Sequence, residues 1–444
     1  MANTYLSRTQ GTGNRQKFTL STWFKTAKTN ADQTFYGSFV NSSNYDYIFL
    51  NSSAQMNVNF RASGSNTAYI TTNRKFKDVS AFYHVVVAVD TTQGTEADRI
   101  KIYINGVQET SFATATYPSV NTNTTFNNGG TVYVGSVDGS QQYFDGSLSH
   151  FHWVDGTAYP ASTFGESDSV SGIWKPKTAP SVTYGTNGLF LKFENSGAMG
   201  TDSSGETNTF SPSGTLTQNV DTPSNNFATL NPLDVPYPAQ QATFTNGNLT
   251  GQCTTSGFIS GTSSFGVSAG KFYAEFKLAD GNIGLSAIGV LTDPVDDLGT
   301  TAPHDSSKFY GARGQGSIYV AGTGTDSWAD SWSTNDIIGL GLDLDNNRLY
   351  VSKNGQWADG SGNYDESNPN AYITLASNQT YFFMGSNITT GTGQYLKMQS
   401  NFGQGYFGTT VVASAGTAPS EGGIFEYNCP TGFQALCTKG INSF

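Results

Sequence analysis

The sequence predicts an all-β protein built from two consecutive antiparallel β-sandwiches of the jelly-roll type. Two-residue alternation of apolar side chains recurs along the chain, whereas no window of about 11 residues has the i, i+3, i+4 spacing of an amphipathic helix. The chain has 51 glycines, 13% aromatic and only 12% charged residues, a mixture typical of short strands joined by tight turns. Its 444 residues exceed what one compact domain usually holds, so we expect two.

The first half contains two clear strand signals. Ile100, Ile102 and Ile104 alternate with polar residues, and the Asn105-Gly106 pair that follows tolerates the positive φ of a hairpin turn. Upstream, residues 85–89 are continuously apolar. We therefore expect a central strand at 85–89 that is covered on both faces.

The second half repeats this pattern. Residues 337–345 form an apolar run that ends in acids, Asn346-Asn347 supplies a turn, and residues 348–353 form the returning strand before Asn354-Gly355. Two apolar runs joined by such short turns predict a hairpin. The shared order of strands and turns predicts related architectures for the two halves.

A stretch of different composition separates the halves. Residues 196–244 are rich in Ser, Thr, Asn and Pro, which predicts a connector between sandwiches at 1–195 and 245–444. The connector holds apolar residues at Phe227, Leu230 and Leu233. We expect these side chains to pack it along the first sandwich.

The charge balance argues against a nucleic-acid partner. The net charge is −11, whereas a protein that follows phosphates needs a basic face. The first 31 residues are a local exception, which favours either a solvated edge or a docking surface for an acidic partner. The basic residues there are Arg8, Arg15, Lys17, Lys25 and Lys28.

The chain lacks the long apolar runs of targeting and membrane segments. We expect no signal peptide, because the first residues are polar, and no membrane insertion, because no run approaches about 18 apolar residues. The three cysteines, Cys253, Cys429 and Cys437, fit neither a disulfide framework nor a zinc site. We expect them to be reduced, and the chain to be made in a cytoplasm.

The carboxylates do not predict a catalytic pair. A retaining glycosidase needs two carboxyl groups on one face, about 5–5.5 Å apart. Glu96 and Asp98 have a suitable spacing but fall in a predicted loop, and Asp343 and Asp345 end a hairpin strand. We expect both pairs to be structural, and the protein not to be an enzyme.

The histidines do not predict a metal or a triad. His150 and His152 would share one side of a strand and could hold a metal, but no third ligand stands at a convincing spacing. Neither a Gly-x-Ser-x-Gly elbow before a helix nor a phosphate-binding glycine loop is present. The scattered loop acids also fail to predict a calcium site. We therefore expect no catalytic residue, no metal and no cofactor.

Aromatic loops in the second half are the main candidate for ligand binding. Trp328 lies in a polar setting, and Trp357 and Tyr364 lie close to Asp359 and Asp365. A flat ring beside acids and amides is suited to sugar recognition. The alternative is that one or more of these rings cap the core.

The first half contains a weaker version of the same arrangement. Tyr45 and Tyr47 lie near Asn41 and Asn44, so rings and amides again occur close together. We include both tyrosines among the predicted ligand-binding residues.

Two known families resemble the two halves. The first resembles concanavalin-A-like, laminin-G-like domains over roughly residues 15–195, through segments 18–25, 84–90, 102–106, 132–135 and 144–149. The second is similar to the SPRY family over about residues 245–410, through segments 270–276, 288–290, 332–339, 353–355 and 401–403. Both resemblances imply β-sandwiches. SPRY domains usually recognise proteins.

Further segments resemble virion structural proteins of marine tailed phages, including those of cyanobacteria. They are Asn14-Arg15 and residues 155–166, 174–176, 184–188, 221–233 and 430–438. Such proteins are commonly tail-fibre or host-recognition proteins. The resemblance implies a virion location, other virion proteins as partners, and a symmetric oligomer, with a trimer favoured.

These observations favour a non-enzymatic attachment protein that binds a host-surface glycan. Weak sugar sites gain on the order of 10²–10⁴ in avidity when several are displayed together. A capsid decoration or connector protein that binds other virion proteins is the second hypothesis. A depolymerase of envelope polysaccharide is the third.

Overall fold

The protein is nearly all β, as predicted, in a computed structural model that describes residues 3–234, 242–253, 260–292, 302–387 and 396–444. The chain divides into two compact units, residues 1–218 with 222–224 and residues 219–221 with 225–444. No helix in these described ranges is long and apolar enough to cross a membrane. The helical segments are α1 (Thr438–Ile441) and short 3-10 turns at Glu96–Asp98, Ala161–Thr163, Ile283–Leu285 and Pro303–Asp305.

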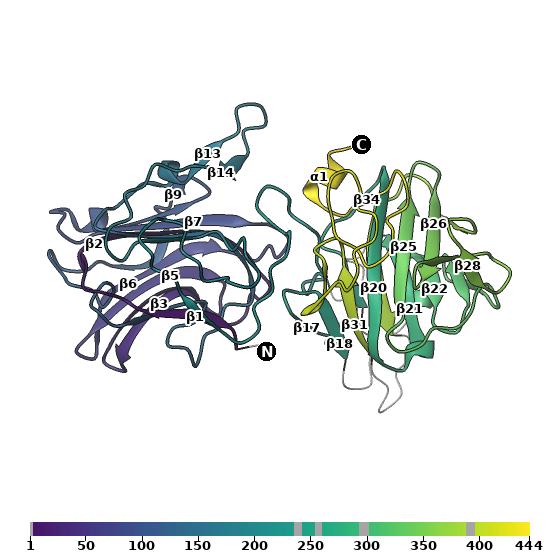
Figure 1. Ribbon diagram of the computed structural model, residues 1–444, viewed down its shortest axis with the longest axis horizontal. Coiled ribbons are helices and arrows are strands. Elements are labelled where there is room, and N and C mark those ends of the chain that lie inside the picture. The colour runs from purple at the N-terminus through teal and green to yellow at the C-terminus, as the bar shows by residue number, and fades with distance from the viewer. Residues whose placement is uncertain (1–2, 235–241, 254–259, 293–301, 388–395) are drawn as a thin grey trace. The chain divides into compact units, whose positions relative to one another are not determined.

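Two antiparallel sheets form the first unit (Figure 1). The eight-stranded sheet has the order β10 (Phe112–Thr116), β6 (Ser65–Lys75), β5 (Gln55–Ala62), β4 (Asn44–Leu50), β3 (Gln33–Asn41), β11 (Thr131–Val134), β1 (Tyr5–Thr9) and β16 (Ser211–Ser213). The six-stranded sheet has the order β15 (Leu189–Leu191), β12 (Gly146–Asp155), β2 (Lys17–Thr26), β7 (Tyr83–Asp90), β8 (Ile100–Ile104) and β9 (Val107–Gln108). Apolar side chains from both sheets fill the space between them.

The six-stranded sheet is covered on both faces, which confirms the prediction for residues 85–89. Val85 and Val87 of β7 face the sandwich core, whereas Val86 packs with Phe164 and Tyr184 on the outer face. The covering layer comes from residues 156–190. It includes the hairpin of β13 (Gly165–Ser167) and β14 (Trp174–Pro176).

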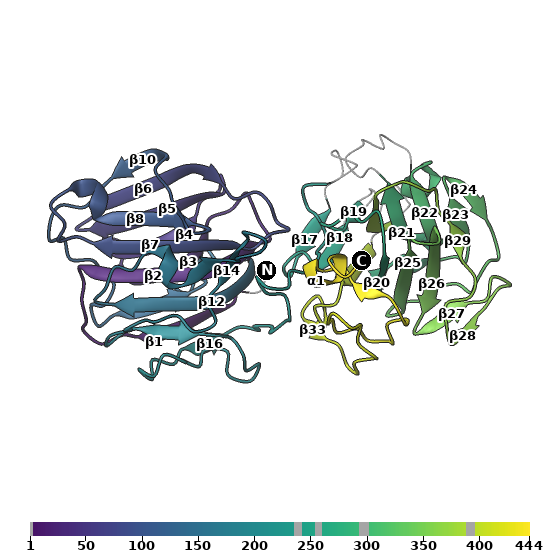
Figure 2. The ribbon, with the colours of Figure 1, turned by 90° about the horizontal axis from the view of Figure 1, so that it is seen from above.

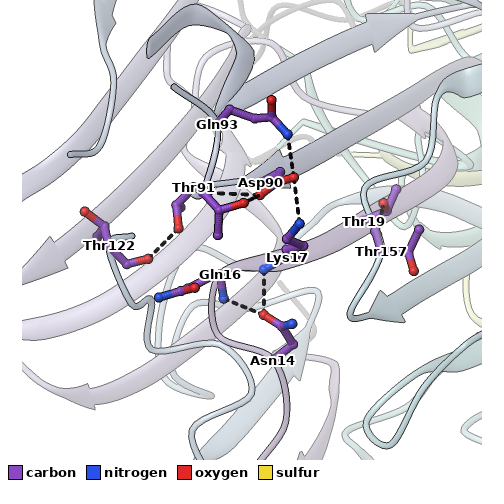
Figure 3. A network of polar contacts seen from close by, with 10 residues as sticks. Asn14, Gln16, Lys17, Thr19, Asp90, Thr91, Gln93, Thr122 and Thr157 are labelled. Carbon is purple, nitrogen blue, oxygen red and sulfur yellow. Dashed lines mark hydrogen bonds and ion pairs between the residues drawn. The ribbon is translucent and has the colours of Figure 1, made fainter. Parts of the chain in front are cut away.

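Most basic side chains near the N-terminus bind their own unit. Figure 3 shows the Lys17 ammonium 3.1 Å from an Asp90 carboxylate oxygen, which also accepts a hydrogen bond from Gln93. Lys28 pairs with Asp145, and Arg15 donates to the Thr124 carbonyl. These pairings favour a solvated edge over a docking surface. The Lys25 side chain is buried as well.

The second unit is also a sandwich of two sheets (Figure 2). Its larger sheet has the order β17 (Thr243–Thr245), β18 (Thr250–Cys253), β31 (Leu396–Asn401), β20 (Lys271–Gly281), β25 (Ile337–Asp343), β26 (Arg348–Lys353), β27 (Gln356–Ala358) and β28 (Tyr364–Glu366), with β29 (Ile373–Thr374) on β26 and β34 (Gln434–Ala435) on β20. Its smaller sheet has the order β19 (Ser260–Thr262), β30 (Tyr381–Asn387), β21 (Ser286–Thr292), β22 (Phe309–Arg313), β23 (Ile318–Val320) and β24 (Thr323–Thr325). A separate hairpin joins β32 (Tyr406–Phe407) to β33 (Thr410–Val411).

The Asn-Gly turns have the conformation that their sequence predicts. Asn105 and Gly106 have φ values of 48° and 84°, and Asn354 and Gly355 have 52° and 82°. Two consecutive residues with positive φ form the hairpin turn that matches the twist of antiparallel strands. These turns fix the registers of β8 with β9 and of β26 with β27.

The C-terminal segment covers the outer face of the larger sheet. Phe425 and Phe433 pack with Tyr273 and Trp357 in a separate apolar cluster on that face. Beneath the segment, the fully buried Glu275 carboxylate accepts hydrogen bonds from the backbone N–H groups of 426 and 427, both at 2.9 Å. The C-terminal segment is therefore a layer of the second unit.

The predicted connector at 196–244 is not a separate element, and its packing differs from our expectation. Phe210 and β16 join the first sandwich, whereas Leu230 is buried in the core of the second unit and Phe227 in its outer cluster. Leu233 is 56% exposed. Phe227 and Leu230 thus pack in the second unit, and the Ala228 N–H between them donates to the Leu436 carbonyl, which places this segment beside the C-terminal layer.

Candidate functional site

The aromatic residues predicted to bind ligand in the second unit are buried. Trp328, Trp357 and Tyr364 retain 9%, 4% and 9% of their surface. Trp328 and Tyr364 lie in the sandwich core, where Trp332 Nε1 donates a hydrogen bond to the Tyr364 hydroxyl, 3.0 Å away. The burial of these rings agrees with the alternative that they cap the core. These rings present no open face on which a sugar could stack.

The two acids predicted beside them have local roles or lie apart from any open ring. Asp359 accepts hydrogen bonds from the backbone and side chains of Ser361 and Asn363, and these bonds hold the pKa of its carboxyl well below the usual range. Asp359 therefore stabilises its own loop. Asp365 is exposed in β28, and its neighbour Tyr364 points into the core.

The two tyrosines predicted in the first unit lie together on the outward face of the eight-stranded sheet. The two-residue period of β4 turns Ile48 and Leu50 into the core and Tyr45, Tyr47 and Phe49 away from it. The Tyr45 and Tyr47 ring centroids are 5.6 Å apart, and those of Tyr47 and Phe49 are 4.3 Å apart. Strand β4 thus carries a line of rings on one face, of which Tyr47 and Phe49 are buried, at 9% and 3% exposed, and Tyr45 is partly exposed.

Neighbouring strands extend this line into a surface. Phe39 of β3 stands opposite Tyr45, and their rings stack at 6.1 Å. In β5, Asn59 stands opposite Tyr47 and next to Tyr69 of β6, so ring, amide and ring occupy successive strands about 4.8 Å apart. We call Phe39, Tyr45, Tyr47, Asn59, Arg61 and Tyr69 the tyrosine face.

Arg61 gives the tyrosine face its positive charge. Its guanidinium carbon lies 5.6 Å from the Tyr45 ring centroid, and Nη1 donates to Asn66 Oδ1 at 3.2 Å. Arg61 Nε and Asn59 Oδ1 are buried without a hydrogen-bond partner. An unmade hydrogen bond at a buried polar atom costs about 1–3 kcal/mol, and a ligand on the face does not reach either of these atoms as they lie.

Phenol ionisation does not contribute charge to this face. Burial raises the pKa of Tyr47 to about 12, so its hydroxyl is neutral at physiological pH. The face therefore combines neutral rings, one amide and one guanidinium.

A second group of tyrosines lies on the same sheet. Tyr5 and Tyr133 meet edge to face at 5.8 Å, and Tyr5 stacks with Tyr143 at 6.3 Å. Residues 136–142 separate this group from the tyrosine face, because Val137 packs over Gly37, where a Cβ atom would lie 2.6 Å from the Val137 carbonyl oxygen. The loop divides the aromatic surface into two patches.

Asn41 and Asn44 bind the chain rather than the open face. Asn41 Oδ1 accepts from Ser43 N–H and from the Asn44 amide, and Asn44 Oδ1 accepts from Ser63 N–H. They hold two adjacent turns in place. Four residues of the tyrosine face were not predicted from the sequence: Phe39, Asn59, Arg61 and Tyr69. The period-two pattern of 55–62 and 65–75 carries the signal for the last three once strand pairing is known.

The paired histidines do not form a metal site. A bulge at His150, with φ of 49°, interrupts the pairing of β12 with β2. His152 is 2% exposed, stacks on Phe190 at 3.9 Å and hydrogen-bonds through Nδ1 to the Tyr184 hydroxyl. Within the residues that the structure describes, no group of three or more His, Cys, Asp or Glu is placed to hold a metal.

The candidate acid pairs have structural partners. Asp98 lies 3.0 Å from the Lys101 ammonium, next to the short helix Glu96–Asp98. Asp343 pairs with Lys271 at 3.0 Å and accepts from Asn346 in the following turn. Asp98 and Asp343 are thus explained by the contacts that hold their own turn or strand, and Asp345 accepts a hydrogen bond from Gly270 N–H at 3.1 Å.

Both predicted families are present in the chain. Residues 2–161 match the family described as the concanavalin A-like lectin/glucanases superfamily (Laminin_G_3). The tyrosine face lies within these residues. Residues 271–371 match the SPRY domain. The chain thus combines two β-sandwich domains of binding type, and no catalytic family is identified.

Solved structures with similarity to the chain have low sequence identity. The SPRY domain of human HERC1 is 20% identical, covering 38% of this chain and 96% of that one, with a TM-score of 0.31. A heptameric SAP-like pentraxin from Limulus polyphemus is 17% identical, covering 42% and 88%, with a TM-score of 0.28. No curated protein matches the chain.

Proposed function

We propose that the first unit binds carbohydrate on the tyrosine face and that the protein attaches a phage particle to a host-surface glycan. The observation that carries the proposal is the grouping of Tyr45, Tyr69 and Asn59 with Arg61 on one face of a concanavalin-A-like domain. Sugars stack their apolar faces on aromatic rings and exchange hydrogen bonds with amides and guanidinium groups. The family description includes lectins, which agrees with this chemistry.

Strand pairing sets the extent of surface that a ligand could cover. The row through Tyr47 passes to Asn59 of β5 and Tyr69 of β6, and in the other direction it reaches Gly37, where Val137 covers the sheet. Strands β3 to β6 together span roughly 14 Å at the usual strand separation. The tyrosine face therefore suits a short stretch of a polysaccharide.

The virion assignment rests on the segments that resemble phage structural proteins. Three of them lie close together, since Asn14 N–H and Asn187 N–H both donate to the Asp155 carboxylate. In this proposal the other partners are virion proteins, and a homo-oligomer, with a trimer favoured, multiplies weak sugar contacts.

An experiment with matched variants tests the proposal. The full chain and its Tyr45→Ala and Tyr69→Ala variants are applied to an array of bacterial envelope polysaccharides, with Tyr372→Ala as control. Tyr372 is a 43% exposed tyrosine of the second unit. We expect both first-unit variants to lose most binding and the control to retain it. Equal binding by all forms, or by none, contradicts the proposal.

A second candidate function has its own supporting observation. In the second unit Arg348 stacks on the exposed Tyr372 ring at 4.2 Å and hydrogen-bonds to Tyr350. Tyrosine and arginine are enriched in protein interfaces, so this pair suits a decoration or connector role. Electron microscopy of intact particles distinguishes the two: a position at the tail tip supports attachment, and a lattice on the capsid supports decoration. Release of reducing ends from envelope sugar would instead support a depolymerase.

A further inference from the structure

We infer that the glycan recognised on the tyrosine face is anionic and that Arg61 reads its negative charge; this inference rests on the proposed function. The other five members of the face are uncharged side chains, and Arg61 supplies a single positive charge among them. A charged group placed within an aromatic surface selects for a ligand of opposite charge. The inference names the class of sugar: one that carries a carboxylate or a sulfate ester.

The Arg61 guanidinium can bind such a group only through its Nη atoms, because its Nε is buried. No carboxylate forms an ion pair with it within the described ranges; it stacks on Tyr45 and donates from Nη1 to Asn66. Two other arginines of the first unit are engaged. Arg74 pairs with Glu109 at 2.7 Å, and Arg99 donates to three backbone carbonyls.

The nearest buried carboxylate does not neutralise Arg61 across the sheet. Asp46 lies on β4, accepts hydrogen bonds from the backbone N–H groups of Arg61 and Thr125, and is 1% exposed. Burial raises the pKa of Asp46 to about 6, so its negative charge is weakened under mildly acidic conditions. The side chain of Arg61 extends from the opposite side of the strand, toward the tyrosines.

Geometry also favours a carboxylated or sulfated ring over an isolated anion. The planar guanidinium can donate two parallel hydrogen bonds to one carboxylate or sulfate group. The Tyr45 ring beside it offers a flat apolar surface of the size of one pyranose. One anionic sugar could thus place its ring against Tyr45 and its acid group against Arg61. A lysine at this position could not make the paired contact.

The net charge of the protein opposes the binding of an anionic glycan at long range. At −11 the chain repels an anionic polymer at long range, so non-specific attraction cannot account for binding. Affinity for an acidic glycan must then come from local contact at a positive site. Added salt will screen both the repulsion and the local pair, so side-chain variants are the more direct test.

The test uses the full chain and calorimetric titration with polymers in matched pairs. The pairs are polygalacturonate and its methyl ester, alginate and its carboxyl-reduced form, and dextran sulfate and dextran. Arg61→Met removes the charge and keeps much of the side-chain volume. Lys101→Met is the control, because it makes the same charge change on β8 of the other sheet, where Lys101 pairs only with Asp98 at the surface.

We expect binding to at least one anionic polymer at no less than ten times the affinity for its neutral partner. Arg61→Met should weaken that binding about tenfold, Arg61→Lys by less, and Lys101→Met should not change it. Unaltered thermal unfolding shows that the variants are folded. Whether the carboxylated or the sulfated polymers bind shows which anionic group the site recognises.

Two outcomes overturn the inference in distinguishable ways. In the first outcome, the neutral and anionic polymers of a pair bind equally, Arg61→Met binds as well as the native chain, and Tyr45→Ala still loses binding. The proposed function then stands, and the inference that the glycan is anionic is wrong. If the native chain binds none of the six polymers and no envelope polysaccharide, both fail.

Discussion

Trp174 donates a hydrogen bond from its indole Nε1 to Nδ1 of His84, 3.0 Å away on the outer face of the six-stranded sheet. Because Nδ1 accepts, the neutral His84 ring carries its proton on Nε2, which donates to Ser21 Oγ at 2.9 Å. His84 also stacks on Trp23 at 4.8 Å. The Nε2–H tautomer of the buried His84 thus allows Nδ1 to accept the hydrogen bond that holds Trp174 of the covering hairpin against the sheet.

We predict that His84 stays neutral as the Nε2–H tautomer at pH 5. Burial lowers the pKa of His84 to about 3, against a usual value of 6.5. The folded state therefore resists protonation, and the stability that His84 contributes is complete above pH 6.5 and falls by about 1.4 kcal/mol per pH unit below it. Nitrogen chemical shifts of ¹⁵N-labelled histidine would measure this. An imidazolium signal from His84 at pH 5, or a proton on Nδ1, contradicts the assignment.

Glu275 should give the second unit the opposite pH dependence. Burial raises the pKa of Glu275 to about 7, from a usual value of 4.5. The folded state holds its proton more tightly than the unfolded state, so this contribution to stability is complete below pH 4.5 and declines up to pH 7, by about 1.4 kcal/mol per pH unit. We predict that the native chain loses stability relative to Glu275→Gln across this range.

Urea unfolding of both forms between pH 4 and 8 would measure the difference. A native chain that gains stability relative to the variant as the pH rises would show that the hydrogen bonds from 426 and 427 outweigh burial and keep the carboxylate ionised.

Replacing Trp357 should affect stability and leave sugar binding unchanged. The ring packs against Tyr273, Phe433 and the C-terminal layer, so Trp357→Ala opens a cavity that costs about 3–5 kcal/mol. Tyr372→Ala, at an exposed site in the same unit, should change stability by less than about 0.5 kcal/mol. Chemical unfolding provides the comparison. If the folded Trp357→Ala variant lost glycan binding, the loop that follows Asn354-Gly355 in the second unit would be the binding site, contrary to the prediction.

Gly13 should tolerate no side chain. A Cβ atom there would lie 2.1 Å from an Asp155 carboxylate oxygen and 2.6 Å from the Asn187 amide nitrogen. Gly13→Ala must displace this buried network, at a cost of about 1–3 kcal/mol. Gly94→Ala is the matched control, because no atom lies within 4 Å of its Cβ position. Equal melting temperatures for the two variants would contradict the close approach at Gly13.

The sequence was sufficient where the controlling interactions are local. Alternation in 100–104, the Asn105-Gly106 turn and the apolar run at 85–89 each depend on neighbours within a few residues, and the structure confirms all three. Strand period and turn chemistry act at short range. The fold class and the two sandwiches followed from these patterns and from the family resemblances.

The candidate site was only partly predictable, because it depends on which strands pair. Tyr45 and Tyr47 were identified, but Arg61 joins Tyr45 only through the register of β4 with β5. Local sequence gives no measure of that register. The burial of Trp357 also depends on a segment distant in sequence, because the C-terminal layer that contains Phe433 packs over it. In the connector, local sequence also did not show that Leu230 packs in the core of the second unit rather than on the first sandwich.

Hydroxyl-radical footprinting of the full chain, with and without a saturating envelope polysaccharide that it binds, tests the central claim most directly. The account predicts that oxidation of Tyr45, Tyr69 and Phe39 falls on binding while Tyr372 is oxidised at an unchanged rate. Protection confined to Tyr372 and its neighbours in the second unit, with the tyrosine face still oxidised as in the free protein, would contradict it.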